Sequence, residues 1–240
     1  MTHLSVNLNK IGILRNSRGR DYPNMVKMAK QTLDQGAFGI TIHPRPDQRH
    51  ATYQDAYDLK ELLAQYPDRE LNIEGFPSDE FLKIVLEVVP DQCTLVPDDP
   101  NQLTSDHGWN LGRDRETLIP IISKLQAAGI RVSLFIDPDP EAMVLVRETG
   151  AERVELYTEA YANAWPTDKK NEILAQYNET AKVAVDLGLE VNAGHDLDLE
   201  NIADLCASGL ITEVSIGHAL TVEALDMGWN NAIQAYLKCL

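Results

Sequence analysis

The stretch KLQAAGIRVSLFIDPDPEAMVLVRETGAERVEL, residues 124–156, decides the fold class. It starts in a predicted helix that ends before Gly129 and continues into a short apolar run at 131–136. The acidic segment 138–141 then opens a second helix, which ends before Gly150 and is followed by another apolar run at 153–156. Glycine favours the left-handed helix C-cap, and acidic residues favour a helix start. The stretch therefore predicts two parallel strands joined by a helix.

The same unit repeats along the whole chain without a linker or low-complexity tract. Predicted strands cover residues 4–7, 39–43, 70–74, 92–96, 131–136, 153–156, 190–193 and 213–216. Predicted helices cover residues 24–35, 54–66, 78–89, 114–128, 139–148, 168–187, 199–207 and 221–240, and three more of them end before Gly36, Gly188 and Gly209. We expect a single domain over residues 1–240, an α/β fold of the (β/α)8 TIM-barrel type with extra short helices in the βα loops. An open doubly wound sheet is expected to carry a glycine-rich phosphate-binding motif after the first strand, and residues 7–10 contain no glycine.

Composition narrows the possible partners. The chain has 240 residues, with 21 Lys and Arg against 37 Asp and Glu, so its net charge is −16. A chain this acidic is a poor partner for nucleic acid or an anionic membrane, although small phosphates can still bind in a local pocket. Cys93, Cys206 and Cys239 are widely spaced, so we expect reduced core cysteines. The first residues lack a leader pattern and no 18 apolar residues run together, which predicts a cytoplasmic protein.

Reactive residue types follow the predicted strands at their carboxyl ends, where barrel enzymes place their sites. They are Asn7 and Asn9 after the first strand, His43, Arg45 and His50 after the second, Glu74 on the third, Glu155 on the sixth, His195 after the seventh and His218 after the eighth.

The second of these loops, residues 43–50, places a titratable imidazole beside a fixed cation. Both His43 and Arg45 precede proline, which favours extended backbone and projects the two side chains to the same side. That arrangement suits proton transfer on a phosphorylated substrate. The alternative is a rigid surface loop with solvated charges.

The strand at 70–74 alternates, so Asn72 and Glu74 should face the barrel axis and Leu71 and Ile73 the helices. A carboxylate inside a barrel either pairs with a buried cation or has a raised pKa that suits a general base. The position of Glu74 at the end of the strand favours its role as a general base over a buried ion pair.

Three further segments are candidates for phosphate binding. Gly194-His195 and Gly217-His218 follow the seventh and eighth strands, where barrels often bind phosphate, although both glycines can be ordinary turn residues. The basic segment 15–20 is either a loop that closes over a phosphate or a solvated turn.

Motifs of other enzyme classes are missing from the sequence: there is no HExxH, no Walker loop and no GxSxG elbow. His43, Glu74 and His195 could be imagined as metal ligands, but the nearby arginines would oppose a divalent cation. We therefore expect an acid–base site without metal or cofactor.

Seven segments together resemble the pyridoxine 5′-phosphate synthase family of deoxyxylulose-dependent vitamin B6 biosynthesis, over essentially the whole chain. They are residues 6–19, 39–50, 72–74, 95–97, 132–137, 191–195 and 216–219. The resemblance implies a condensation of 3-amino-2-oxopropyl phosphate with 1-deoxy-D-xylulose 5-phosphate that needs no cofactor. The products are pyridoxine 5′-phosphate, inorganic phosphate and water.

The resemblance also implies residue roles. His43 and Glu74 would accept protons, His195 would donate one, and Glu155 would help to stabilise a transition state. The aminoketone phosphate would be held by Asn7, Arg18, Asp196, Gly217 and His218, and the deoxyxylulose phosphate by Asn9, Lys10, Arg45, His50 and Thr104. The chain departs from the commoner family pattern at Asn9 and Lys10, where Asp-His is usual, and at Glu159 and Asp196, where Gly is usual.

Two other functions compete with this one. The first is another sugar-phosphate isomerase or lyase with His43 and Glu74 as its acid–base pair. The second is a barrel that binds phosphorylated metabolites without catalysis, which would have no need of three proton-transfer groups. The resemblance further implies a homo-oligomer, with an octamer as the family's form. The chain itself shows only an apolar segment at 160–165, within a long connection that extends to 167 and is either a lid or an interface.

Overall fold

A computed structural model describes residues 1–98 and 105–240 of the chain. Eight parallel strands close into a barrel in the order of the sequence, with β1 pairing both β2 and β8. The strands are β1 (His3–Asn7), β2 (Gly39–Ile42), β3 (Glu70–Gly75), β4 (Gln92–Leu95), β5 (Arg131–Ile136), β6 (Arg153–Tyr157), β7 (Glu190–Gly194) and β8 (Glu213–Ile216). Each predicted strand lies within one residue of these bounds, and the predicted (β/α)8 barrel is confirmed.

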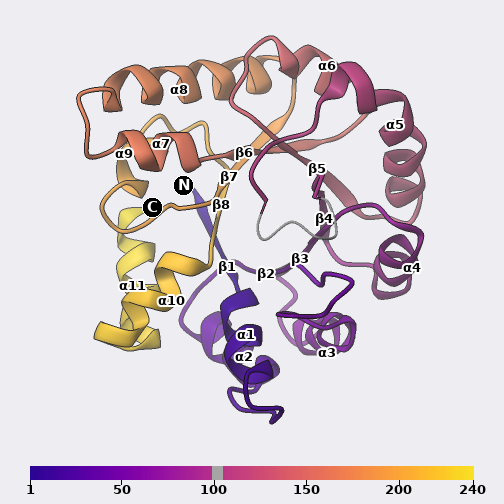
Figure 1. Cartoon of the computed structure of the whole chain (residues 1–240), viewed down its shortest axis with the longest axis vertical. Coiled ribbons are helices and arrows are strands. Elements are labelled where there is room, and N and C mark those ends of the chain that lie inside the picture. The colour runs from indigo at the N-terminus through magenta and orange to yellow at the C-terminus, as the bar shows by residue number, and fades with distance from the viewer. Residues whose placement is uncertain (99–104) are drawn as a thin grey trace.

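The helices surround the strands in a ring (Figure 1). They are α1 (Asn9–Asn16), α2 (Met25–Asp34), α3 (Tyr53–Leu63), α4 (Asp79–Val88), α5 (Leu111–Ala127), α6 (Ala142–Thr149), α7 (Glu159–Ala164), α8 (Lys170–Asp186), α9 (Ile202–Cys206), α10 (His218–Met227) and α11 (Trp229–Cys239). None of the helices in the described parts of the chain combines the length and apolar character needed to cross a membrane.

Local signals explain where these helices start and stop. Asn24 and Ser78 accept hydrogen bonds from the backbone N–H groups of the first turns of α2 and α4. The glycines that follow the helices of the opening stretch are left-handed, with φ of 82° at Gly129 and 85° at Gly150.

Several predicted helix boundaries are wrong; for example, α3 ends at Leu63 and α9 begins only at Ile202, each three residues from the prediction. Helix α5 begins at Leu111, three residues before the predicted start at residue 114, because the Asn110 side chain caps it. Helix α6 begins only at Ala142, because Asp139 accepts a hydrogen bond from the backbone of Glu141 and forms a turn there. The helix predicted over 221–240 is two helices, separated at Gly228 with φ 85° and ψ 149°.

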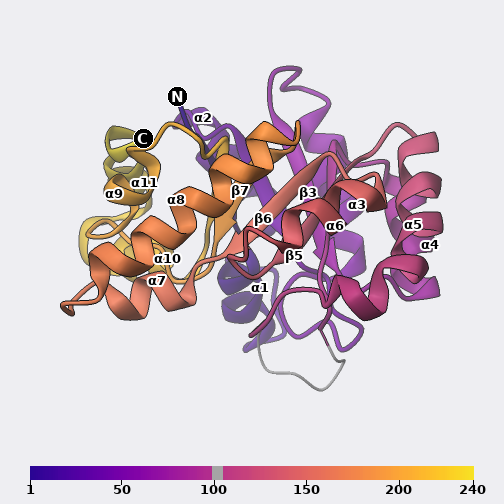
Figure 2. The ribbon, with the colours of Figure 1, turned by 90° about the horizontal axis from the view of Figure 1, so that it is seen from above.

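Two short helices lie in βα loops, as the fold class anticipated. Helix α1 follows β1 directly and carries Asn9 and Lys10, whose segment was predicted only as the end of a strand and a loop. Figure 2 shows α1 at the opposite end of the barrel from the N-terminus, where β1 begins. The carboxyl end of the barrel is therefore partly covered by helix.

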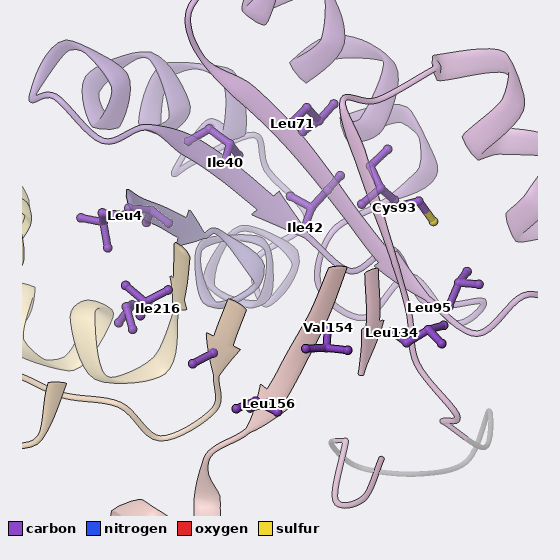
Figure 3. Close-up of a cluster of buried hydrophobic side chains, with 14 of the residues drawn as sticks. Leu4, Ile40, Ile42, Leu71, Cys93, Leu95, Leu134, Val154, Leu156 and Ile216 are labelled. Atoms are coloured by element: carbon purple, nitrogen blue, oxygen red, sulfur yellow. The ribbon is translucent and has the colours of Figure 1, made fainter. Parts of the chain in front are cut away.

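The apolar core lies between the strands and the surrounding helices. Figure 3 shows the side chains that the strands direct there, among them Leu4, Ile40, Leu71, Cys93 and Ile216. All three cysteines are free, and Cys239 is the one that is partly exposed.

The axis of the barrel is polar instead, unlike the layers of branched apolar residues usual in this fold. Asn72 is buried and lies between Thr41 and Thr94, whose hydroxyls are 3.4 Å and 3.0 Å from its amide group. The alternation predicted for β3 is confirmed.

The apolar segment 160–165, predicted to be either a lid or an interface, is exposed only in part, and which of the two it forms stays a prediction. Tyr161 is fully buried, packs against the Trp165 and Tyr177 rings, and donates a hydrogen bond to the Asn201 carbonyl at 2.7 Å. Ala164 is also buried. These side chains fasten α7 to the body of the barrel.

Candidate active site

A cavity of about 490 Å³ opens at the carboxyl ends of the strands. It brings together most of the predicted site residues: Asn7, Asn9, Lys10, His43, Arg45, His50, Glu74, Glu155, His195, Asp196, Gly217 and His218. Arg18 does not line the cavity and is exposed in the turn that follows α1. Thr104 lies outside the described residues.

The first wall of the cavity is built by two asparagines. The Asn7 side-chain carbonyl accepts a hydrogen bond from the Asn9 backbone N–H at 3.0 Å, and the Asn9 side chain accepts one from the His43 backbone N–H at 2.9 Å. Asn7 Nδ2 also donates to Glu74 Oε2 at 3.4 Å. Asn9 therefore ties the start of α1 to the loop that carries His43.

Two imidazoles face each other beside this wall. The His43 and His50 rings are 5.8 Å apart and inclined by 67°. Burial, His50 and Arg45 lower the pKa of His43 well below its ordinary value, and burial together with Arg45 and Arg49 lowers the pKa of His50 to about 4. Both rings are thus neutral near pH 7, and a neutral imidazole can accept a proton.

Arg45 is buried and its charge is balanced. Its Nη1 lies 3.1 Å from Asp98 Oδ2, which also accepts a hydrogen bond from the Ser105 hydroxyl at 2.8 Å. The interpretation of residues 43–50 as a solvated surface loop is therefore wrong for His43, Arg45 and His50, which are all buried.

Two carboxyl groups occupy the floor of the cavity. Burial, followed by the charges of Glu155, Asp98 and Glu213, raises the pKa of Glu74 well above its ordinary value. Burial and Glu213 raise the pKa of Glu155 to about 8. Because the charges that act on Glu74 come from carboxylates, the site favours its protonated form and makes it a strong base once ionised.

Gly194 makes room for one of these carboxyl groups. It is the last residue of β7, and a Cβ atom placed on it would overlap Glu155 Oε1 and lie 3.3 Å from Glu155 Cδ. The absence of a side chain here is a requirement of Glu155, which neither sequence interpretation of the Gly194 turn anticipated.

Gly217 precedes α10, whose first residues also line the cavity. A Cβ atom on Gly217 would approach the Asn7 side chain to 3.0 Å, so the glycine lets the helix start close to β1. The unpaired N–H groups of a helix N-terminus favour an anion, which agrees with a phosphate at this wall.

His195 and Asp196 form an unusual turn. Their φ angles are 84° and 58°, in the left-handed region that most side chains avoid. Burial lowers the pKa of His195, while the charges of Asp196, Asp98 and Glu159 act in the opposite direction. The Asp196 side chain is exposed, and its backbone carbonyl accepts a hydrogen bond from Asn201 Nδ2 at 3.2 Å.

Sequence reasoning missed several residues of this site. Asp98 and Ser105 were not selected, although Asp98 lies three residues after the end of the fourth strand, and that position was a usable signal. Phe135 and Val96 also line the cavity. The alternation of their strands was a usable signal, because Phe135 lies between the core residues Leu134 and Ile136 and Val96 follows the core residue Leu95.

The basic segment 15–20 is divided between two roles. Arg15 ends α1 and donates to Asp55 Oδ2 at 2.8 Å, whereas Arg18 and Arg20 are exposed. A separate hollow of about 370 Å³ is lined by Arg15, Asn16, Gly19 and Arg20 of this segment, but not by Arg18.

No group of three or more His, Cys, Asp or Glu side chains in residues 1–98 and 105–240 is arranged to hold a metal ion.

Comparison with solved structures shows the same fold in distant proteins. The chain superposes on a protein from Aquifex aeolicus VF5 with a TM-score of 0.67 at 14% identity, covering 100% of this chain and 93% of that one. A phosphoribosylanthranilate isomerase from Thermotoga maritima gives a TM-score of 0.58 at 13% identity, with 100% and 98% covered. These likenesses concern the fold alone.

Sequence comparison identifies the family. Two curated relatives named pyridoxine 5′-phosphate synthase, from Albidiferax ferrireducens and Bacteroides thetaiotaomicron, are each 49% identical to the chain and cover all of it, with 97% and 100% of their own lengths aligned. The sequence model of the family described as "Pyridoxal phosphate biosynthesis protein PdxJ" matches residues 4–240. This chain, a (β/α)8 barrel with a buried His and Glu cavity, therefore belongs to the pyridoxal phosphate biosynthesis protein PdxJ family.

Proposed function

We propose that this chain is a pyridoxine 5′-phosphate synthase, which condenses 3-amino-2-oxopropyl phosphate with 1-deoxy-D-xylulose 5-phosphate. The observation that carries the proposal is the convergence of His43, Glu74, Glu155 and His195 in one cavity of a family member. Imine formation, loss of water and phosphate, and ring closure each require proton transfer to or from the reacting atoms, for which histidine and carboxyl groups are suited.

The four side chains have different proposed roles, which depend on whether each holds or lacks a proton near neutral pH. Neutral His43 accepts a proton from the substrate. Glu74 accepts a second once it is ionised and can return it, because burial and the neighbouring carboxylates favour its protonated form. His195 donates a proton to a leaving oxygen from the opposite wall. Glu155, on the cavity floor, stabilises the charge that develops in the transition state.

Two phosphates are held at different walls. Lys10, Asn9, Arg45 and His50 hold the deoxyxylulose phosphate, and the start of α10 with Asn7 holds the aminoketone phosphate. Placing both substrates in one cavity makes the condensation effectively intramolecular, an advantage that reaches about 7–11 kcal/mol in favourable cases. Roles for Arg18 and Thr104 remain proposals from the family resemblance, as does the homo-oligomer, which light scattering on the purified protein would test.

The experiment is an incubation of the purified protein with both substrates, with pyridoxine 5′-phosphate followed by absorbance and mass spectrometry. The reaction is run with and without a metal chelator. We expect product in both. A folded protein that yields no product would refute the proposal and bring forward the isomerase or lyase alternative, whose product would be a rearranged or cleaved sugar phosphate. Binding of both substrates without turnover would indicate a non-catalytic barrel.

A further inference from the structure

The imidazole ring of His195 packs against two aromatic rings. Its ring centroid lies 5.6 Å from that of Phe135 and 5.1 Å from that of Tyr157, with interplanar angles of 61° and 79°. Phe135 and Tyr157 also contact each other, with centroids 5.3 Å apart, and with Val96 they form a small apolar cluster separate from the main core. Tyr157 does not line the cavity itself.

The hydroxyl of Tyr157 is used to hold a carboxylate. It donates to Glu159 Oε2 at 2.5 Å, and Glu159 is the first residue of α7 and half-buried. A short hydrogen bond to a charged acceptor is stronger than one between neutral groups. Glu159 is therefore fixed relative to the Tyr157 ring, which in turn contacts His195.

Thr158, which lies between Tyr157 and Glu159 in the sequence, connects this segment to the turn that contains His195. Thr158 is buried, and its backbone N–H donates to the Gly194 carbonyl at 3.0 Å; its hydroxyl is within hydrogen-bond distance of that carbonyl, at 2.6 Å, and of the His195 carbonyl, and donates its one hydrogen to either. Residues 157–159 thus fasten the end of β6 to the left-handed turn that follows β7.

Charged groups from four segments of the chain act on His195. Carboxylates come from its own turn (Asp196), from the β4 loop (Asp98) and from the start of α7 (Glu159), while Lys10 on α1 acts in the opposite direction. His43, across the cavity, is a further titratable neighbour. Of the carboxylates, Glu159 is the one whose position is set by a residue in contact with the imidazole ring.

We propose that Tyr157 and Glu159 are a positioning pair for His195, in which the Tyr157 ring orients the imidazole and the anchored Glu159 carboxylate stabilises its protonated form. The inference rests on the proposed function, because it supplies His195 with a reason to carry the proton that it donates. Burial lowers the pKa of His195, and the neighbouring carboxylates limit that fall, so that a larger fraction of the imidazole carries the proton it donates.

The direct test is the titration of His195, measured by NMR on protein with 13C at histidine Cε1 and without substrate. The His195 signal is assigned from its loss in His195→Asn. In Glu159→Gln we expect the pKa of His195 to fall by roughly half to one pH unit, the effect of removing one nearby carboxylate charge in a partly solvated site. Tyr157→Phe keeps the ring and releases the carboxylate, so a smaller fall is expected.

Glu61→Gln is the matched control, because Glu61 is an exposed carboxylate on α3, outside the cavity. It should leave the His195 titration unchanged. In the synthase assay, the basic limb of kcat against pH should move to lower pH in Glu159→Gln by the same amount as the titration, because a proton donor fails above its pKa.

The His195 titration tests the positioning pair, and the synthase assay tests the proposed function, so the two can fail separately. An unchanged His195 titration in both Glu159→Gln and Tyr157→Phe would overturn the positioning pair even if the protein is an active synthase. A shifted titration in a protein that makes no pyridoxine 5′-phosphate would support the pair and overturn the proposed function. A shifted titration with an unmoved basic limb would overturn the assignment of the pair to proton donation.

Discussion

Substitution of Gly194 by alanine is a sharp test of the packing around the carboxyl floor of the cavity. The new Cβ would overlap Glu155 Oε1 and reach Glu155 Cδ at 3.3 Å, whereas its next neighbour, the Ser215 carbonyl, is at an ordinary 3.5 Å. Glu155 is 3% exposed and lines the cavity, so its carboxyl group can avoid the new methyl group only by moving into the cavity. The steric conflict is therefore confined to one side chain.

The magnitude follows from this geometry. Overpacking a buried site by one methyl group costs about 1–3 kcal/mol, and glycine in a strand otherwise costs roughly 0.5–1 kcal/mol relative to alanine. Gly194→Ala should thus destabilise the protein when Glu155 is present. In a Glu155→Ala background the conflict is gone, and the same substitution should be neutral or stabilising.

The assay is a double-mutant cycle on the unfolding midpoint of the four proteins, at one protein concentration because assembly would shift the midpoint. For a chain of this size, 1 kcal/mol corresponds to about 2–4 °C in Tm. We expect a coupling of about 1 kcal/mol or more, by the overpacking cost above. Gly112→Ala, in α5 and away from the cavity, serves as the control. An equal cost of Gly194→Ala in both backgrounds would refute the reasoning.

Three further predictions concern the proposed roles. Glu74→Gln should lower turnover by roughly a hundredfold or more, the usual worth of an acid–base group, with an unchanged circular dichroism spectrum; turnover near that of the unsubstituted protein would remove Glu74 from the mechanism. Lys10→Ala should raise the KM for 1-deoxy-D-xylulose 5-phosphate by roughly tenfold, and a change confined to the aminoketone substrate would place Lys10 at the other phosphate. His50→Gln should reduce the loss of stability on acidification from pH 6.5 to pH 4, measured by urea unfolding against His107→Gln. The sign follows from the pKa of about 4 in the folded protein, below the ordinary value of 6.5, so the unfolded state binds the extra proton throughout that interval and stability rises with pH across it; an unchanged pH dependence would contradict it.

The fold was predictable because its signals are local. The apolar runs of the strands and the glycine ends of the helices recur along the chain, and parallel strands joined by helices close most simply into a barrel. The errors in the helices also have local causes that compete with periodicity. Asp139 forms a turn where a helix start was expected, and Gly228 interrupts the last helix.

Much of the cavity was predictable for a related reason. The carboxyl ends of parallel strands in a closed barrel must converge, so the positions of His43, Glu74 and His195 along the chain suffice to predict that they meet. The interior placement of Glu74 followed from the alternation of a single strand. Arg18 shows the limit of this argument, because it follows α1 in a turn whose direction no strand determines.

By itself, the sequence determined the strand order, the polar identity of the barrel axis and the types of group at its carboxyl end. These depend on the period of side chains along a strand and on helix-capping residues, which act within a few positions of the chain. Only the tertiary structure decided that Gly194 leaves room for Glu155, that Asp98 balances Arg45, and that Tyr157 carries Glu159 to His195. Such relations join residues from different strands, and the loss of water that shifts their pKa values exists only once those strands have closed around them.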